Sequence, residues 1–114
     1  MHADQVVELA QQLPDVVLKE HQQWTSITFR GRGFAWVDHH RDTAMIKSTH
    51  LEREAMVGSD PEAFSEGWAS RSTAWVSVDL SRVQADEVFE ILAEAWRMTA
   101  TKRAIVAFEE AMGL

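Results

Sequence analysis

Two arginines and two glycines stand between two runs of strand-forming residues, and they offer the clearest chemistry in the sequence. The segment Arg30-Gly31-Arg32-Gly33 separates the β-branched and aromatic run 24–29 from the run 34–37. Guanidinium groups pair with phosphates in a bidentate manner, and glycines allow a close backbone approach. Lys47 and Arg71 would extend this surface if their strands are neighbours. The pattern predicts a phosphate-binding surface; the alternative is a solvated tip that protects a sheet edge from aggregation.

A second pair of cations, Lys102-Arg103, lies close to the start of the last predicted helix. Backbone N–H groups at a helix N-terminus, together with both side chains, can hold an anion. The alternative is charge pairing with the acid-rich helix that precedes this pair. We therefore treat Lys102 and Arg103 as a candidate anion site.

Five tryptophans are many for a chain of 114 residues. Trp36 and Trp96 fit the apolar patterns of predicted elements, so we expect both rings in the core. Trp24, Trp68 and Trp75 fit those patterns less well. If they are exposed together, they can form a stacking platform or the wall of a ligand pocket. Core packing of at least three of the five tryptophans is the alternative.

Residue types that support catalysis or metal binding are absent or poorly spaced. The chain has no cysteine, which excludes disulfides, thiolate metal sites and a cysteine nucleophile. His39 and His40 are adjacent, and adjacent side chains in an extended chain point in opposite directions. No serine lies in a Gly-x-Ser-x-Gly segment, and no glycine-rich phosphate loop occurs. We expect no catalytic residues, no metal and no cofactor. Two acidic pairs are typical of solvated helix surface: Glu52 and Glu54, and Glu109 and Glu110.

The elements that position these residues begin with a predicted helix over 3–13. Its apolar residues recur near helical spacing, and it stops before Pro14 because the residue preceding a proline is biased away from the α conformation. A short strand is expected over 16–18. Two further strands, over 24–29 and 34–37, are expected to form a hairpin.

The register of this hairpin decides which side chains face the core. We predict a two-residue turn at Gly31-Arg32. Phe29 then lies opposite Phe34, and Ile27 lies opposite Trp36, all on one half-buried face. A slip of one residue would break this pairing.

A third strand is predicted over 43–47, with Ala44 and Ile46 on one side. Thr49 and Glu52 then have the spacing of a capping box, which predicts a helix from Thr49. Gly58 can end that helix in a left-handed conformation.

The remaining elements are predicted from a helix-start dipeptide, an alternating segment and apolar residues at helical spacing. Asp60-Pro61 is typical of the start of a helical turn. Residues 75–80 alternate as a strand, the stripe over 85–99 predicts the clearest helix of the chain, and 101–112 predicts a terminal helix.

This order predicts an α+β fold: helix, three or four strands, helix, strand, helix, helix. Strands joined by hairpins favour an antiparallel sheet covered by helices on one face, so a ligand would bind on the other face. The length and a content of 46% hydrophobic residues favour a single domain over 1–114. No apolar run is long enough to span a bilayer and no export signal is recognised, so we expect a cytoplasmic protein.

Several segments, taken in order, resemble the MmcQ/YjbR-like proteins, small bacterial domains related in fold to the frataxin-like group. The resemblance is carried by Leu13-Pro14, Phe29-Arg30-x-Arg32-Gly33-Phe34, Ala44-x-Ile46-Lys47, Ser59-Asp60-Pro61-Glu62-Ala63-Phe64, Trp75-Val76-x-Val78-x-Leu80, Glu94-Ala95-Trp96-Arg97 and Ala100-Thr101-Lys102-Arg103. It implies the YjbR-like fold. It also implies DNA binding, because the family fold is similar to a double-wing DNA-binding domain. Two departures are Thr101, where many relatives have proline, and Arg71, where relatives often have a lysine-rich stretch.

The leading hypothesis is a non-enzymatic domain that binds double-stranded DNA, with phosphates held by Arg30, Arg32, Lys47 and Arg71. The alternative is a module that binds a small molecule or a protein through a pocket at Trp24, Trp68 and Trp75. The net charge of −7, from 18 acids and 11 bases, opposes tight non-specific nucleic-acid binding and favours the alternative. The oligomeric state is left open.

Overall fold

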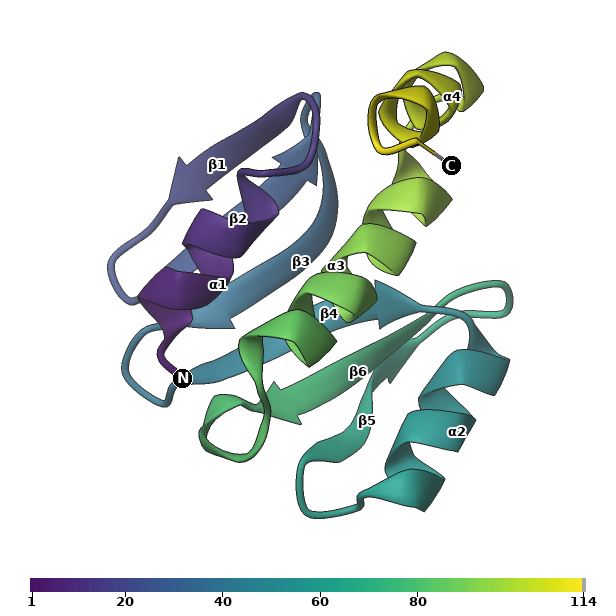
Figure 1. Ribbon diagram of the computed structural model, residues 1–114. Coiled ribbons are helices and arrows are strands. Elements are labelled where there is room, and N and C mark those ends of the chain that lie inside the picture. The colour runs from purple at the N-terminus through teal and green to yellow at the C-terminus, as the bar shows by residue number, and fades with distance from the viewer. Residues whose placement is uncertain (114) are drawn as a thin grey trace.

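The chain folds into a six-stranded antiparallel sheet, and α1, α2 and α3 lie in front of it in Figure 1. The computed structural model describes residues 1–113. The strands, in the spatial order β1-β2-β3-β4-β6-β5, are β1 (Val16–Glu20), β2 (Trp24–Phe29), β3 (Arg32–Asp38), β4 (Thr43–Ser48), β6 (Ala74–Asp79) and β5 (Phe64–Ala69). The helices are α1 (Ala3–Ala10), α2 (His50–Ser59), α3 (Ala85–Thr99) and α4 (Lys102–Ala111), with a short 3-10 turn η1 (Leu80–Arg82) before α3.

The predicted α+β architecture is confirmed, with most of its elements. Helix α1 ends at Ala10, earlier than the predicted end at Leu13, and β1 starts at Val16. Ala44 and Ile46 both face the core from β4. The prediction lacks β5, so two strands rather than one separate α2 from α3.

The β2–β3 hairpin has a different turn from the one predicted. The turn residues are Arg30 and Gly31, with φ of 49° and 95°. Positive φ at both central residues is what a tight type I′ hairpin turn requires, and glycine adopts it without strain. The Gly31 N–H also donates to the Thr28 hydroxyl at 3.1 Å, which supports this turn. The prediction of a two-residue turn at Gly31-Arg32 is therefore wrong.

The register of the hairpin is also different, because β3 contains a bulge. Ile27 pairs with Ala35 and Thr28 with Gly33, which leaves Phe34 as an extra residue on β3. Phe34 is still fully buried, as predicted, but it is not directly opposite Phe29. The predicted pairs therefore do not form, although their phenylalanine and isoleucine side chains all reach the core.

Helix α2 begins as predicted and ends differently. Thr49 and Glu52 form both hydrogen bonds of the capping box. Gly58 lies within the helix and does not adopt positive φ, so it does not end the helix. After α2, Asp60 and Pro61 form a turn rather than a helical segment, with the Ala63 N–H donating to Asp60 Oδ1 at 3.2 Å.

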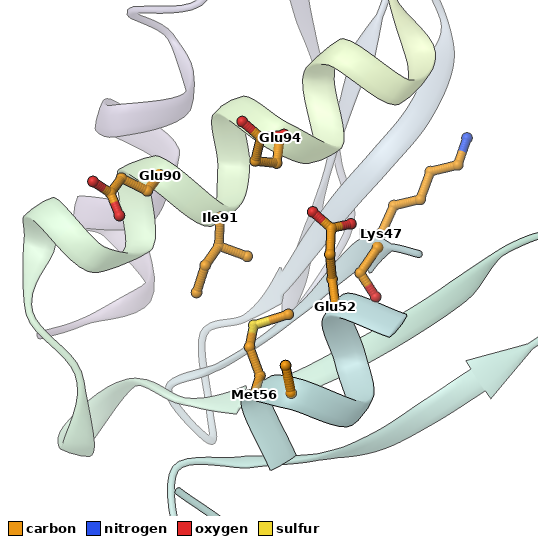
Figure 2. A pocket seen from close by; sticks show the side chains of 8 residues that line it. Lys47, Glu52, Met56, Glu90, Ile91 and Glu94 are labelled. Carbon is orange, nitrogen blue, oxygen red and sulfur yellow. The ribbon is translucent and has the colours of Figure 1, made fainter. Parts of the chain in front are cut away.

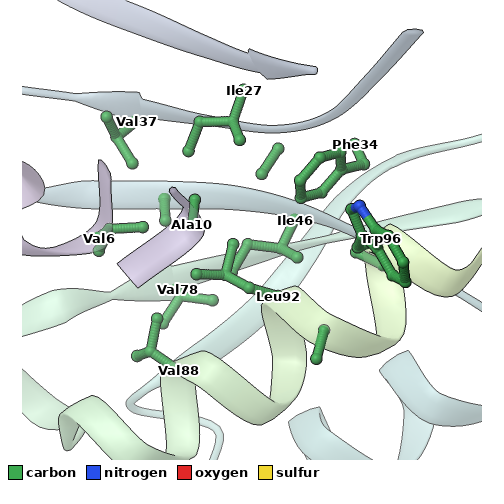
Figure 3. Packing of buried hydrophobic residues seen from close by; sticks show 14 of the residues in the cluster. Val6, Ala10, Ile27, Phe34, Val37, Ile46, Val78, Val88, Leu92 and Trp96 are labelled. Atoms are coloured by element: carbon green, nitrogen blue, oxygen red, sulfur yellow. The ribbon is translucent and has the colours of Figure 1, made fainter. Parts of the chain in front are cut away.

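The core lies between the sheet and the helices α1 and α3 (Figure 3). Trp96 of α3 is fully buried, as predicted, and its ring stands edge-on to Phe29 with the centroids 5.9 Å apart. Its indole Nε1–H donates to the Pro14 carbonyl at 2.9 Å, so the polar end of the ring is satisfied. Within residues 1–113, no helix combines the length and apolar character needed to cross a bilayer.

Candidate functional site

The sheet face opposite α1 and α3, here called the open face, carries aromatic side chains. Trp36 points to this face because Ala35 and Val37 are buried in the core and side chains alternate along a strand. The Trp36 ring lies 5.8 Å from the ring of Trp24, and each residue is 37% exposed. Placing Trp36 in the core is therefore wrong. The bulge at Phe34 reverses the alternation after it, so that Ala35 and Val37 rather than Trp36 face the core.

Trp68 and Trp75 lie elsewhere on the sheet, and the structure does not bring them to Trp24. Trp75 pairs with Lys47 of β4, and an irregularity in β5 sets Gly67 and Trp68 opposite Trp75. Three strand steps separate Trp24 from Trp75. The predicted three-ring pocket therefore does not form, and only Trp96 of the five tryptophans is fully buried.

The four cations predicted on the hairpin surface lie at one end of the sheet. Phe29 pairs with Arg32, and Ser48 and Ala69 both pair with Ala74, so the β2–β3 turn, the end of β4 and the β5–β6 turn share that end. In Figure 1 the two turns lie at the top and at the right, because the sheet is twisted. We call this the basic end; its predicted phosphate ligands are Arg30, Arg32, Lys47 and Arg71.

Two of these four cations are engaged within the protein. Arg30 forms an ion pair with Asp15 through Nη2 at 2.7 Å and Nε at 3.1 Å, and its guanidinium lies over the Phe29 ring. Lys47 Nζ donates to the Thr99 hydroxyl of α3 at 3.2 Å. Arg32 and Arg71 are exposed and form no ion pair within residues 1–113. The latter two are the cations most available to a ligand.

Lys102 and Arg103 open α4 beside the same end. Thr101 caps this helix through the Ala104 N–H, and Arg103 lines a cavity together with Arg30 and Asp15. The predicted pairing with the preceding helix is not seen for these two cations in the described residues. Arg97 forms ion pairs with the acids of both helices instead. Its Nη1 lies 2.9 Å from Glu94 Oε1 of α3, and its Nε lies 3.7 Å from Glu109 Oε1 of α4.

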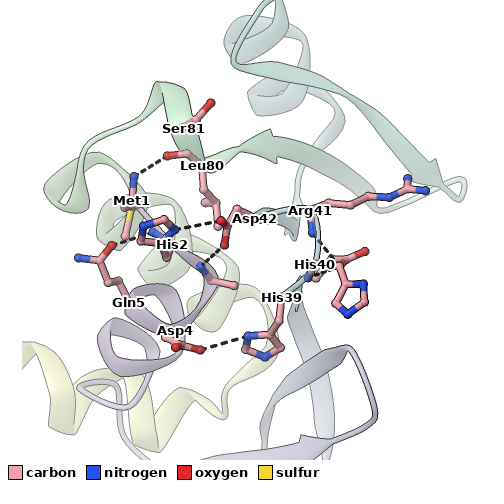
Figure 4. Close-up of polar contacts among 12 residues, drawn as sticks. Met1, His2, Asp4, Gln5, His39, His40, Arg41, Asp42, Leu80 and Ser81 are labelled. Carbon is pink, nitrogen blue, oxygen red and sulfur yellow. Dashed lines mark hydrogen bonds and ion pairs between the residues drawn. The ribbon is translucent and has the colours of Figure 1, made fainter.

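The opposite end of the sheet is mainly acidic. Hydrogen bonds from the side chain and backbone of Ser81 hold the pKa of Asp79 below its usual value. A contact with His2 and the Ala3 N–H does the same for the pKa of Asp42 (Figure 4). The two ends of the sheet therefore differ in their charged residues, although Arg82 pairs with Asp79 and Glu62 at the acidic end and Asp15 pairs with Arg30 at the basic end.

His39 and His40 lie beside this acidic end and turn to different surroundings (Figure 4). His39 Nε2 lies 2.8 Å from the Thr25 hydroxyl, and its Nδ1 lies 3.2 Å from Asp4. The His40 N–H donates to Asp38 Oδ1, and its side chain is exposed. In the part of the chain that the structure describes, no three histidine, aspartate or glutamate side chains could hold a metal ion together.

The sequence and the fold both match known proteins. The model of the YjbR family matches residues 11–98, and no curated protein matches. Among solved structures, the Deinococcus radiodurans protein DR2400, with a DUF419 domain, is similar with a TM-score of 0.74 and 19% sequence identity. The superposition covers 99% of this chain and 88% of that one. At this identity the likeness establishes the fold.

Proposed function

This chain belongs to the YjbR family, and we propose that it is a non-enzymatic binding domain that holds double-stranded DNA against the basic end of its sheet. The observation that carries the proposal is the gathering of Arg30, Arg32, Lys47 and Arg71 at one end, while acids occupy the other. Lys102 and Arg103 add charge beside it. Phosphate contacts of this kind position a protein on a duplex without reading its sequence.

The spacing of the two hairpin turns suits a duplex. Three strand steps separate the β2–β3 turn from the β5–β6 turn, which at about 4.8 Å per step amounts to about 14 Å across the sheet, and the twist of the sheet adds to this separation. The major groove of B-DNA is about 12 Å wide, so Arg32 and Arg71 can reach phosphates on its two sides. Arg30 contributes less, because Asp15 already neutralises it.

Fluorescence anisotropy of a labelled mixed-sequence duplex tests this proposal, with titrations at low and at physiological salt. We expect binding that weakens steeply with salt. The double variant Arg32→Ala/Arg71→Ala should weaken binding for all sequences alike and reduce the salt slope by about 2, or about 1 for each lost phosphate contact.

The matched control is Lys19→Ala/Arg41→Ala, which removes the same net charge from exposed positions away from the basic end. It should leave the salt slope nearly unchanged. Equal losses in both double variants would mean that only the overall charge matters. Absence of binding by the unmodified protein at low salt would reject DNA as the ligand.

A second candidate is a small-molecule or protein site on the open face, favoured by the exposed contact between Trp24 and Trp36. Aromatic rings that no element covers are typical of interaction surfaces. A ligand bound there should change the tryptophan emission of the unmodified protein, and much less that of a Trp24→Phe/Trp36→Phe variant. If DNA produces this difference, the open face rather than the basic end is its binding surface.

A further inference from the structure

Two regions are left uncovered by the described residues 1–113: a groove between α2 and α3, and the outer edge of β1. The groove has a volume of about 310 Å³, and Met56 and Ile91 point toward each other across it (Figure 2). Its carboxylates are exposed or already paired, as Glu94 is with Arg97 at 2.9 Å. The groove therefore selects no particular ligand, whereas the edge of β1 carries a defined row of backbone groups.

Strand β1 is the first strand in the order of the sheet, and Figure 1 shows no described helix or strand on its outer side. The Arg30 N–H donates to the Asp15 carbonyl at 3.2 Å, and the His21 N–H donates to the Trp24 carbonyl at 2.9 Å. Residues 15 and 21 therefore direct their backbone groups toward β2. Hydrogen-bonded pairs alternate along an antiparallel ladder, so 17 and 19 do the same. The residues between them direct their N–H and C=O groups out of the sheet: Val16, Leu18 and Glu20.

The other edge of the sheet, β5, is protected in a way that β1 is not. An irregularity between Glu66 and Ala69 interrupts the pairing of β5 with β6. Arg53 of α2 donates to the Gly67 carbonyl and pairs with Glu66. Bulges and charges of this kind keep an edge strand from pairing with another chain. Strand β1 pairs regularly with β2 over five residues and has Lys19 as its one cation, so it is the edge available to a further strand.

A second copy of this chain fits the edge of β1 in one register. If two β1 strands pair antiparallel about a two-fold axis at Leu18, Leu18 lies opposite itself and Val16 lies opposite Glu20 of the second copy. All the outward backbone groups are then hydrogen-bonded. A shift of two residues in one direction sets Glu20 opposite Pro14, which has no N–H. A shift in the other direction sets Lys19 opposite Lys19 of the second copy, which is unfavourable.

The side chains beside this axis are apolar. Val17 is 48% exposed and lies diagonally across from Val17 of the second copy. Leu18 pairs with Ile27, packs against the core and meets Leu18 of the second copy on the helical side of the sheet. Lys19 lies opposite Val17 of the second copy, so its aliphatic stem covers that side chain while its ammonium stays in water.

We propose that two copies of this chain form a dimer by pairing their β1 strands, which joins two six-stranded sheets into one. A five-residue strand pair is small compared with the about 1,200–2,000 Å² that stable complexes bury, so the dimer is weak and reversible. The start of β1 lies beside the β2–β3 turn, and the two-fold axis places the two basic ends at opposite ends of the joined sheet. The dimer therefore does not rest on DNA binding.

The first test is sedimentation equilibrium of the full chain from about 10 μM to about 1 mM, the range in which a weak dimer forms. We expect the average mass to rise from that of one chain toward that of two, without larger species. Hydrogen exchange at both concentrations then locates the contact. The amides of Val16, Leu18 and Glu20 should exchange fast in the dilute sample and slowly in the concentrated one, while those of Val17 and Lys19 stay slow in both. A chain that remains monomeric at the higher concentration, or a dimer without this alternation, would overturn the proposal.

Substitutions at Val17 test the register, because this exposed side chain lies opposite Lys19 of the second copy. Val17→Glu sets a carboxylate opposite each lysine, whereas Val17→Lys sets an ammonium group there. Both variants lose the same valine contact, so the glutamate variant should dimerise at least about tenfold more tightly than the lysine variant. The control Trp68→Lys, at an exposed position of β5, should leave dimerisation unchanged. Equal affinities of the two Val17 variants, or loss of the dimer in the Trp68 variant, would refute the pairing of β1 about Leu18.

Discussion

Helices α2 and α3 lie on the same side of the sheet, but they are attached in different ways. Helix α3 buries Val88, Leu92, Ala95 and Trp96 in the core, whereas α2 has no buried residue. Its main polar anchor is Arg53, which is 12% exposed in its side chain and donates to the carbonyls of Gly67 at 3.1 Å and Trp75 at 3.5 Å. Helix α3 is therefore held by fully buried apolar residues, whereas α2 is held by the partly buried Met56 and Val57 and by a few polar contacts.

This difference identifies the part of the fold that can open without loss of the core. Local opening occurs at segments with few buried apolar contacts. Helix α2 is such a segment, because none of its residues is fully buried.

The largest effect is expected at Trp96 of α3. Trp96→Ala removes a fully buried ring and the hydrogen bond of its Nε1 to the Pro14 carbonyl, so the free energy of unfolding should fall by about 3–5 kcal/mol. Urea denaturation followed by circular dichroism measures this loss. The control Trp68→Ala removes a ring that is 67% exposed and should cost less than about 0.5 kcal/mol. Similar losses in both variants would contradict the assignment of the core to the α3 half.

A smaller and more local effect is expected at Arg53. Arg53→Met keeps an unbranched apolar stem and leaves two carbonyl groups without their donor, at a cost of about 1–3 kcal/mol. Hydrogen exchange should become faster in α2 and β5 and remain unchanged in α3. Arg82→Met is the matched control, because Arg82 is half exposed and pairs with exposed carboxylates, so it should cost less than about 1 kcal/mol. Protection lost equally in α2 and α3 would mean that the two helices unfold as one unit.

The same contrast explains which elements the sequence predicts well. The stripe of α3 is visible because its apolar residues all face one core. Strand β5 lies at the edge of the sheet, buries Phe64 and exposes most of its other residues, so it shows no alternation. Gly67 in β5 looks like a loop residue, but it is needed because a Cβ there would approach the Trp75 carbonyl to 2.8 Å and the Met45 sulfur more closely still. Its role depends on β6, which no local pattern reveals.

For the candidate sites too, the sequence predicts the residues but not their arrangement in space. The cations Arg30, Arg32, Lys47 and Arg71 could be named from composition and turn signals, but their shared end depends on the order of strands in the sheet. The neutralisation of Arg30 by Asp15 requires the pairing of β1 with β2, which is a long-range contact. The outward position of Trp36 depends on a bulge in β3. The free edge of β1 follows from the order of the strands, which no local pattern reveals.

The N-caps of the two helices provide a third test of the comparison. Thr49 accepts from the Glu52 N–H at the start of α2, whereas Gln84, at the start of α3, makes no side-chain cap. Thr49→Ala should lower the free energy of unfolding by about 1 kcal/mol and loosen the first turn of α2 in hydrogen exchange. Gln84→Ala should have almost no effect on either measurement. A larger loss for the Gln84 variant would show that α3 also depends on its first turn.

The smallest effect is expected at Asp42, in the β3–β4 turn. Its polar contacts with the start of α1 add to the apolar burial that already holds this helix. Asp42 lies 2.9 Å from His2 Nδ1 and accepts from the Ala3 N–H at 3.0 Å, and these contacts lower its pKa from the ordinary 3.8. A carboxyl with a lowered folded pKa adds stability above its unfolded pKa of about 4 and loses it as the pH falls through the folded value. Asp42→Asn should therefore lower the melting temperature slightly at neutral pH. In the acid range, the melting temperature of the variant should fall less with decreasing pH than that of the unmodified protein. Burial of Val6 and Ala10 keeps α1 in place in both forms. Thermal unfolding at neutral pH and at about pH 3 measures the change, and a large drop at neutral pH would mean that α1 is held by the carboxylate rather than by the core.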